Sequence, residues 1–237
     1  MNKWDMIWKN RDVGTDINLE DDVFKMFCKL KRADGFDTQE ISGYYEAFFE
    51  EWKRFESNIR EIAGKYSSVF EVGCGSGVNL YLFKKLVGCT QLGGVDYSQK
   101  LVDVAKKIIL SEDIRCMEAI DVDVEKKYDI VISDSVFQYF QTREYGIDVL
   151  EKMYNKANKC IVITEIHDID KKTEHLNYRR QCVEDYDKKY EGLDKTFYSK
   201  NDFINFSNKV GAKCLIRQPE NQLYWNNKFV FDCYIVK

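Results

Sequence analysis

The 237-residue sequence predicts an α/β fold, with a mostly parallel sheet and helices on both of its faces. From Ser67 to Thr164, short apolar runs alternate with segments of helical periodicity, and this alternation occurs five times. Beyond residue 198, a further helical segment and two apolar runs follow. A terminal hairpin through Asn226-Asn227 would make the last strand antiparallel to the others.

Each expected strand is a short apolar run, and turn or helix signals flank it. The alternating region gives strands at 69–72, 91–96, 114–117, 128–133 and 160–164, and the end of the chain gives strands at 213–217 and 229–236. Apolar residues at three- and four-residue steps predict helices around 80–87, 101–109 and 147–157. Ser199 and Asp202 resemble a capping box ahead of another helix, which Gly211 would end.

The first 66 residues are expected to form a helical cap. Their main signal is an apolar stripe with helical spacing, formed by Ile41, Tyr44, Phe48, Trp52, Phe55, Ile59 and Ile62. A shorter amphipathic helix is expected near residues 23–30, a loop at 33–37, and a shared helix face for Trp4 and Trp8. Residues 67–237 would then form the main domain, with a polar insert at 166–198 on the acceptor side.

Composition excludes several classes of protein. Hydrophobic residues make up 44% of the chain, which is enough for a sizeable core and excludes disorder. The formal charge of −4 argues against nucleic-acid partners and against docking on membranes. The apolar runs are of strand length, the N-terminus lacks the apolar core of a signal peptide, and no Cys or His pairs have metal-site spacing. We expect a cytoplasmic protein without a metal.

The chemically informative segment is Glu71-Val72-Gly73-Cys74-Gly75-Ser76-Gly77, which follows a strand and opens a helix. Glycines at such a turn let the backbone approach a ligand closely. Asp96 ends the next strand, where a carboxylate can accept the hydroxyls of a ribose. The lysine of a P-loop is missing, and Glu71 would repel a pyrophosphate but suits a cationic ligand such as an aminoacyl sulfonium.

Three segments resemble motifs of the class I S-adenosylmethionine (SAM)-dependent methyltransferases. Phe70–Gly77 resembles motif I, Gly94–Ser98 resembles motif II, and Tyr128–Phe140 resembles the motif of the fourth strand. Together they cover residues 67–165 in the order and spacing of that family. The resemblance implies a Rossmann-like seven-stranded sheet with an antiparallel last strand, and an enzyme that uses SAM and releases S-adenosylhomocysteine (SAH).

The resemblance also assigns cofactor-binding roles by position. It implies that Glu71 and the backbone of Gly73, Gly75 and Gly77 hold the methionine end of the cofactor. Asp96 would bind the ribose hydroxyls, and Tyr97 would pack against the adenine. Further along the chain, Ile120 and Asp121 would lie at the adenine edge. The order Ala119-Ile120-Asp121 departs there from the Asp-Ala that the family often has. Ser133, Asp134 and Ser135 would line the methionine portion and the methyl donor.

Two histidines are candidate general bases for the acceptor. His167 is expected three residues past the fifth strand, beside Glu165 and Asp168, where a carboxylate would orient it. His175 is expected in the helical stretch that follows. The candidate acceptor-binding residues offer aromatic walls or charge, and they are Tyr44, Tyr139, Glu165, Tyr178, Arg179 and Tyr198.

The expected reaction is O-methylation of a small molecule. The Asn/Asp-Pro-Pro-Tyr-type signature of enzymes that methylate nucleobase amines is absent, since Ser133-Asp134-Ser135-Val136 stands in its place. The insert from Asn177 to Tyr198, together with residues 33–37, resembles small-molecule methyltransferases found with surface-polysaccharide biosynthesis. This second resemblance implies a sugar, a sugar-linked compound or another metabolite with an anionic group.

Three alternatives stay open at this point. The chain could be a non-catalytic SAM-fold module that acts as a scaffold, or an N-methyltransferase of a small amine. A nicotinamide-dependent oxidoreductase would share the glycine turn and the acid at the strand end, but Val78 breaks its G-x-G-x-x-G spacing. The sequence leaves the oligomeric state unknown.

Overall fold

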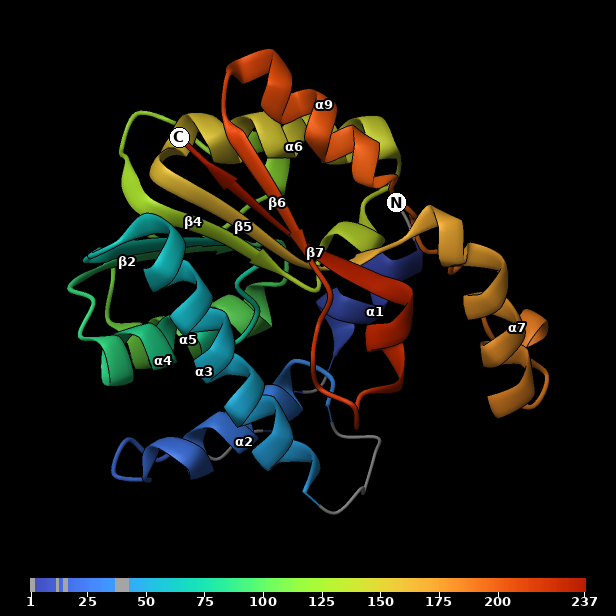
Figure 1. Ribbon diagram of the computed structural model, residues 1–237. Helices are drawn as coiled ribbons and strands as arrows, with labels where there is room; N and C mark the ends of the chain where they lie inside the picture. Colours follow the sequence, from blue (N-terminus) through green and yellow to red (C-terminus); the bar gives the residue numbers. More distant parts are fainter. Residues whose placement is uncertain (1–2, 12, 15–16, 37–42) are drawn as a thin grey trace.

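The computed structural model describes residues 3–11, 13–14, 17–36 and 43–237, and its centre is one seven-stranded sheet (Figure 1). The strand order is β3-β2-β1-β4-β5-β7-β6. Ile41 and Asp37, which the sequence assigned to a helix and a loop, lie outside the described residues. The strands are β1 (Ser68–Val72), β2 (Gln91–Asp96), β3 (Ile114–Cys116), β4 (Tyr128–Asp134), β5 (Ala157–His167), β6 (Lys213–Arg217) and β7 (Val230–Val236).

The direction of the strands confirms the predicted fold class. Strands β1 to β5 are parallel to one another. Strand β7 is inserted between β5 and β6 and is antiparallel to both. The chain winds outward from β1 toward β3 and then restarts at β4 on the other side of β1. In open α/β sheets ligands bind where the strand order reverses in this way, at the carboxyl ends of the strands.

Strand β5 is longer than the sequence predicted. It continues past an irregularity in its pairing with β7, and Ile166 and His167 pair with Phe231 and Val230. His167 therefore lies in the strand, and its predicted position in a loop after the strand is wrong. The polar pair Thr164-Glu165 interrupts the apolar run in the sequence, which hid the remainder of the strand.

Helices cover both faces of the sheet and enclose two apolar cores (Figure 1). On one face lie α3 (Tyr44–Ala63), α4 (Val78–Leu82) and α5 (Gln99–Ile109), and a π-helical turn at Phe83–Val87 extends α4. On the other face lie α6 (Arg143–Lys156) and α9 (Lys200–Val210). Helix α2 (Val23–Ala33) packs against α3 and α4 and reaches the glycine turn.

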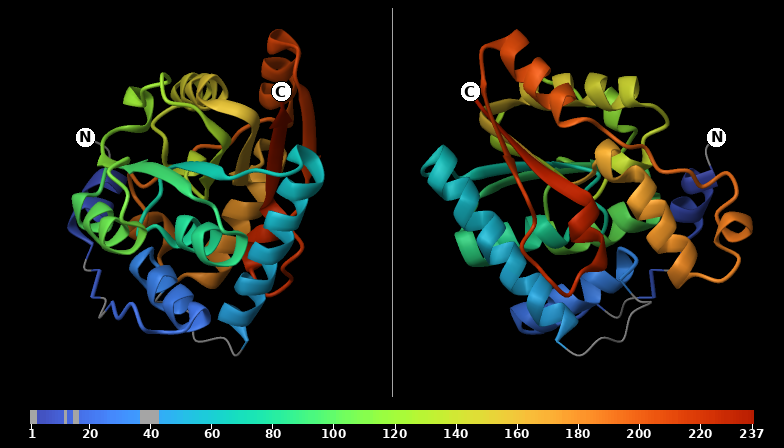
Figure 2. Two further views of the ribbon diagram at one scale, coloured as in Figure 1. Left: turned by 90° about the vertical axis from the view of Figure 1, so that its left-hand side faces the viewer. Right: turned by 45° about the vertical axis from the view of Figure 1, so that its right-hand side comes forward.

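The N-terminal helix and the segment between β5 and α9 meet beside the carboxyl edge of the sheet (Figure 2). Helix α1 (Lys3–Asn10) lies next to the segment that follows α7 (Lys172–Cys182) and α8 (Tyr186–Lys189). The Lys3 ammonium donates to the Glu191 carbonyl at 2.7 Å, and the Trp4 indole donates to the Asp194 carbonyl at 3.1 Å. No helix within the described ranges combines the length and the apolar character that crossing a membrane requires.

Helix α9 begins at the predicted capping box. The Ser199 hydroxyl oxygen accepts a hydrogen bond from the Asn201 N–H, and the Asp202 carboxylate accepts one from the Ser199 N–H. Asp202 also forms an ion pair with Arg143 of α6 at 2.6 Å. Gly211 ends the helix in a left-handed conformation, as predicted. The cap therefore fixes the start of α9 and ties it to α6.

Replacing Ser199 with alanine should lower the free energy of unfolding by about 1 kcal/mol, because the backbone N–H groups of the first turn lose an acceptor. Urea unfolding followed by circular dichroism measures the change. Asn205→Ala, at an exposed position in the middle of the same helix, is the control and should stay within about 0.5 kcal/mol of the wild type. Equal effects from the two substitutions would contradict a capping role.

Candidate functional site

A cavity of about 530 Å³ lies at the carboxyl ends of β1, β2 and β4. Its lining includes the glycine turn after β1, Asp96 at the end of β2 and Asp134 at the end of β4. From there it continues to Trp4 and Trp8 of α1 and to residues of α7 and of the segment after it. The cavity therefore lies between the sheet edge, α1 and the segment between β5 and α9.

The turn after β1 requires glycine at Gly73 and Gly75. Both have positive φ angles, of 76° and 51°. A Cβ on Gly73 would lie 2.3 Å from a methyl carbon of Val136, and a Cβ on Gly75 would lie 2.6 Å from a carboxylate oxygen of Asp34. The turn thus forms a cradle that a side chain would fill, and Gly77 follows it as the residue before α4.

Asp96 is joined to this turn by a hydrogen bond. Its Oδ2 accepts from the Gly75 N–H at 3.0 Å, and its Oδ1 accepts from the Ser98 N–H at 2.8 Å. Burial raises the pKa of Asp96 to about 6, although the two N–H donors oppose the rise. Each carboxylate oxygen has a second lone pair that can accept from a ligand hydroxyl. This geometry fits the predicted ribose contact.

Glu71 carries an unsatisfied buried oxygen. Its side chain lines the cavity although the residue is only 2% exposed, and its Oε1 accepts from Asn79 Nδ2 at 2.7 Å. Its Oε2 has no hydrogen-bond partner among the described residues. Asn79 Nδ2 also donates to Asp134 at 3.1 Å, so one amide bridges two carboxyl groups. Burial raises the pKa of Glu71 well above its ordinary value, and Asp134 raises it further. A cationic ligand group would satisfy both acids.

Helix α2 adds two charged residues to the cavity that the sequence did not single out. The Asp34 carboxylate accepts from the Ser76 N–H at 2.7 Å and from the Ser76 hydroxyl at 2.8 Å, which places the end of α2 over the glycine turn. The Lys31 ammonium lies 3.9 Å from Asp134 and stands over the rings of Phe36 and Phe48. An ammonium at this point can bind a ligand carboxylate.

The ends of β4 and β5 meet at a strained pair of residues. Ser135 and Glu165 both have positive φ angles, of 58° and 54°, which is uncommon for residues with side chains. The Ser135 hydroxyl donates to Glu165 Oε2 at 2.8 Å, and Gln138 Nε2 donates to the Ser135 carbonyl at 2.9 Å. Ser133 instead donates to the Val72 carbonyl at 2.9 Å and is buried between β4 and β1, away from the cavity lining.

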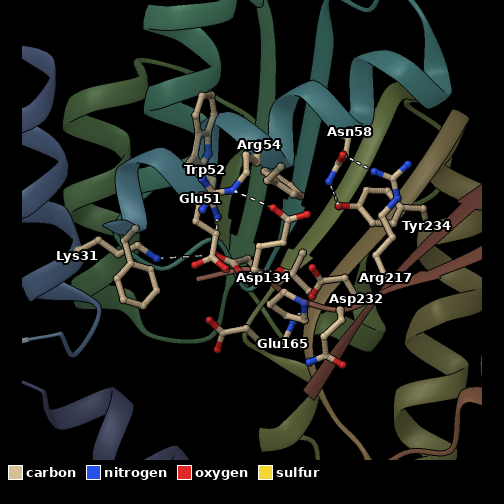
Figure 3. A pocket seen from close by; sticks show the side chains of 17 residues that line it. Lys31, Glu51, Trp52, Arg54, Asn58, Asp134, Glu165, Arg217, Asp232 and Tyr234 are labelled. Carbon is tan, nitrogen blue, oxygen red and sulfur yellow. Dashed lines mark hydrogen bonds and ion pairs between the residues drawn. The ribbon is translucent and has the colours of Figure 1, made fainter. Parts of the chain in front are cut away.

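A side chamber of about 300 Å³ adjoins the cavity (Figure 3). Lys31, Asn79 and Asp134 line both spaces, so the two meet at the end of β4. Carboxyl groups gather around the chamber from separate elements, with Glu51 on α3, Glu165 on β5 and Asp232 on β7. Asp232 Oδ1 accepts from the Glu165 N–H at 3.0 Å.

Burial disfavours the ionised form of the carboxyl groups around the side chamber. It raises the pKa of Glu165 to about 7 and the pKa of Asp232 well above its ordinary value, and neighbouring carboxyl groups add to both shifts. The pKa of Lys31 is raised, because the surrounding carboxylates outweigh its burial. A carboxyl group with a pKa near neutrality, such as Glu165, can exchange a proton at physiological pH.

One wall of the cavity is aromatic and carries positive charge, and it begins beside Asp96, because the Ser98 hydroxyl donates to the Trp8 carbonyl at 3.0 Å. Trp4 and Trp8 of α1, which share a helix face as predicted, pack edge-on against Tyr139 at ring distances of 5.0 and 5.6 Å. Two cations, Arg179 and Lys195, also belong to this wall. Of the predicted acceptor-binding residues, Tyr44, Tyr139 and Arg179 line the cavity, and Glu165 lines the chamber.

Tyr178 and Tyr198 are not among the described residues that line either space. Tyr198 is fully buried, donates to the Phe137 carbonyl at 3.0 Å and packs against Gly146. Tyr178 stacks on Trp225 at a ring distance of 5.3 Å, outside the lining. The positions of both rings are explained by packing.

The two histidines lie together in a buried cluster, with ring centroids 4.9 Å apart. His175 lines the cavity, whereas His167 is absent from the described lining and faces Asn226 at 3.4 Å. The carboxylate expected to orient His167 pairs elsewhere, since Asp168 binds Lys200 at 2.5 Å. Burial lowers the pKa of His167 well below its ordinary value and that of His175 to about 4.

The end beyond Asp96 is the predicted adenine site. Tyr97 lines the cavity there. Ile120 and Asp121 lie in a short 3₁₀ turn and are absent from the described lining, to which the preceding Met117, Glu118 and Ala119 contribute. The chain thus reaches the cavity slightly earlier than the resemblance placed it.

Comparisons with known proteins agree with this architecture. A protein family described as a methyltransferase domain matches residues 70–159. A malonyl-[acyl-carrier protein] O-methyltransferase from Priestia megaterium is 27% identical over 99 residues, which are 41% of this chain and 36% of that protein. Peramine synthetase ppzA from Metarhizium majus is 27% identical over 118 residues, but the match covers 4% of its length. The matched part of this chain thus spans well under half the length of these two curated relatives.

Solved structures resemble the chain over most of its length. The plantazolicin methyltransferase BpumL in complex with SAH superposes with a TM-score of 0.63 at 16% identity, covering 91% of this chain and 93% of that one. Magnesium protoporphyrin IX methyltransferase from Synechocystis, also with bound SAH, gives a TM-score of 0.60 at 12% identity, covering 85% and 90%. At these identities the likeness establishes the fold.

The site should make the free protein less stable as the pH rises toward neutrality. Burial raises the pKa of Asp34 to about 7, of Asp96 to about 6 and of Glu165 to about 7. In an unfolded chain such groups titrate near about 4, so between about pH 4 and 7 the folded state binds more protons and the free energy of unfolding falls as pH rises. Differential scanning fluorimetry should give a lower melting temperature at about pH 8 than at about pH 5.5.

Glu165→Gln provides the control for this pH dependence, because an amide does not titrate in that window. The fall in melting temperature should be smaller in Glu165→Gln than in the wild type. An identical fall in the two proteins would show that Glu165 titrates near its ordinary pKa.

Proposed function

We propose that this chain, which belongs to the class I SAM-dependent methyltransferase family, transfers the methyl group of SAM to a small-molecule acceptor and releases SAH. The observation that carries the proposal is the unpaired, buried Glu71 Oε2 beside the glycine cradle. A buried carboxyl oxygen without a donor is costly, and a ligand ammonium in the cradle would satisfy it. Asp96, bonded to the same turn, would accept the ribose hydroxyls.

The remaining cofactor contacts follow from the lining of the cavity. Tyr97, Met117 and Ala119 would surround the adenine, and the Lys31 ammonium would bind the methionine carboxylate. In this arrangement, residues 1–66 act as a helical cap on the domain of residues 67–237, and the insert at 166–198 supplies the acceptor side. The hydrogen bonds from Trp4 and Lys3 to the segment after α8 support that division of roles.

The bound cofactor would supply an electrophilic methyl group on a sulfonium sulfur. The protein's task is to align the acceptor with that methyl group and to exclude water. Glu165 would take up the acceptor's proton, because it lies at the junction with the side chamber and Ser135 holds its Oε2. We prefer Glu165 to His167 and His175, whose lowered pKa values make them weak bases.

We propose an oxygen acceptor on a sugar-like or anionic metabolite. Aromatic rings in the wall of the cavity, among them Trp4 and Tyr139, support a flat or ring-shaped acceptor, and Arg179 supports one with negative charge. A small amine is the second candidate, because Glu51, Glu165 and Asp232 around the side chamber would favour a cation there. Incubating the protein with labelled SAM and a panel of hydroxyl, carboxyl and amine compounds would distinguish these acceptors from each other and from a non-catalytic module.

The cofactor assignment makes a prediction about Asp96. SAH should raise the melting temperature of the wild type, and Asp96→Ala should abolish the shift, because the ribose loses its acceptor and the glycine turn loses its tie to β2. Calorimetry should show a dissociation constant at least about tenfold higher in the variant. Asp103→Ala, on the exposed side of α5, is the matched control and should bind SAH as the wild type does. A wild type that ignores SAH at millimolar concentration would refute the proposal.

The proton-acceptor role makes a prediction about pH. With an acceptor found in the panel, kcat/KM should rise with pH through about 7, as the pKa of Glu165 requires. Glu165→Gln should lower kcat by about 10² or more and remove this rising limb, because a positioned base contributes roughly that factor. SAH affinity should stay close to that of the wild type. A variant that keeps both the rate and the pH profile would assign proton uptake to another group.

A further inference from the structure

The aromatic wall of the cavity holds two cations, Arg179 and Lys195, that have no counterion among the described residues. The Arg179 guanidinium stands over the rings of Tyr186, Tyr190 and Trp225 at 5.3, 4.9 and 5.1 Å. The Lys195 ammonium stands over Trp4 and Tyr139 at 5.7 and 4.8 Å. Neither cation forms an ion pair with a carboxylate in the part of the chain that the structure describes. Aromatic faces thus hold both charges in place without neutralising them.

The neighbouring arginine shows that this arrangement is specific to Arg179. Arg180 is the next residue on α7, is exposed, and forms an ion pair with Asp187 at 3.0 Å. Arg179 is partly buried and lines the cavity. Among the described residues it forms no ion pair with Asp187, which pairs with Arg180. Two adjacent arginines on one helix therefore differ in burial and in charge neutralisation, which makes Arg180 a natural control.

Three buried polar atoms without partners lie around the same space. They are His175 Nδ1, Gln138 Oε1 and Asn226 Oδ1, which find no hydrogen-bond partner within the described residues. All three residues line the cavity and are at most 2% exposed. Buried polar atoms are nearly always hydrogen-bonded, so unpaired ones in a cavity wall point to a ligand that supplies the missing donors and acceptors.

The positive charges in this wall repel one another. Burial lowers the pKa of Lys195 to about 8, and Arg179 lowers it further, while Glu165 and Tyr190 act in the opposite direction. Lys195 and Arg179 also lower the pKa of His175. A bound anion would relieve this repulsion and would pair with two partly desolvated charges, where charge-assisted hydrogen bonds are strong.

We propose that Lys195 and Arg179 form an anion subsite that binds a carboxylate or phosphate group of the methyl acceptor. The inference rests on the proposed function, since it concerns the acceptor end of the same cavity. Arg179 presents a planar fork suited to two oxygens, and Lys195 supplies a point charge. Gln138 and Asn226 then accept hydrogen bonds from hydroxyl or amine groups on the rest of the acceptor, and the cofactor's own carboxylate stays with Lys31.

The test titrates the SAH-saturated protein with acetate and with inorganic phosphate, and it follows the indole N–H signals by NMR. The chain has four tryptophans, of which Trp4 and Trp225 stack on the two cations, whereas Trp52 lines the side chamber and serves as an internal control. We expect saturable shifts of Trp4 and Trp225 and none of Trp52. Response to one anion alone identifies a carboxylate or a phosphate acceptor, and response to both supports a general oxyanion site.

Substitutions then assign the binding. Lys195→Met and Arg179→Met should each raise the dissociation constant at least about tenfold, because each removes one of two desolvated charges, while Arg180→Met should leave it unchanged. Lys195→Arg keeps the charge and should retain binding, which guards against a loss caused by misfolding. Equal affinity in the wild type and Lys195→Met, or no saturable shift in a protein that binds SAH, would overturn the subsite. A wild type that fails to bind SAH would instead refute the proposed function.

The pH dependence gives a second readout. Acetate affinity of the wild type should fall about tenfold between about pH 7 and 9, because Lys195 loses its proton near pH 8. Lys195→Arg should remove this fall, since an arginine stays charged throughout the range. Retention of the fall in Lys195→Arg would assign the titration to another group and would contradict the role of Lys195.

Discussion

The hydrogen bond from the Gly75 N–H to Asp96 is the interaction on which the site depends. It fixes the turn after β1 against the end of β2, and the same turn receives Asp34 from α2 through Ser76. Three elements distant in sequence are thereby positioned around one short stretch of backbone. Because side chains at Gly73 and Gly75 would collide with Val136 and Asp34, the backbone itself forms the floor of the cavity.

Around this floor the protein concentrates charge that its fold alone does not neutralise. Carboxyl groups gather at Asp134, Glu165 and Asp232 on β4, β5 and β7, and Arg179 and Lys195 stand over aromatic rings in the cavity wall. Elsewhere, apolar side chains pack continuously on both faces of the sheet. This packing stabilises the fold and offsets the free energy that is lost at the strained and charged site. Strain at Ser135 and Glu165 is located at the junction of the cavity and the side chamber.

Sequence reasoning recovered the features that are local. Strand β2 and strand β6 begin and end where the apolar runs predicted, and the glycine turn and Asp96 were found because they stand at the carboxyl ends of strands. Lys31 and Lys195 were missed, since long-range packing alone brings them to the cavity. The sequence offered only weak signals for them: Lys31 stands shortly before the loop at 33–37, and Lys195 lies inside the insert.

The misplaced aromatic and histidine residues have a related cause. Tyr198 lies in a polar segment, yet Gly146 leaves room for its ring in the core, and no local pattern reports that space. His167 was displaced in the prediction because Thr164-Glu165 hid the end of β5. The sequence shows which aromatic and titratable side chains the insert contains. Which of them reach the cavity depends on the helices and strands that pack against the insert.

The acids around the side chamber and the cations Arg179 and Lys195 have a consequence for regiochemistry. A ligand that bears one anionic group and several equivalent nucleophilic atoms can enter such a dipolar space in one direction, with its negative end away from the acids. The separation between that anionic group and the methylated atom would then be set by the cavity and not by intrinsic reactivity. A single modified isomer is the expected product, even from a substrate with many hydroxyl groups.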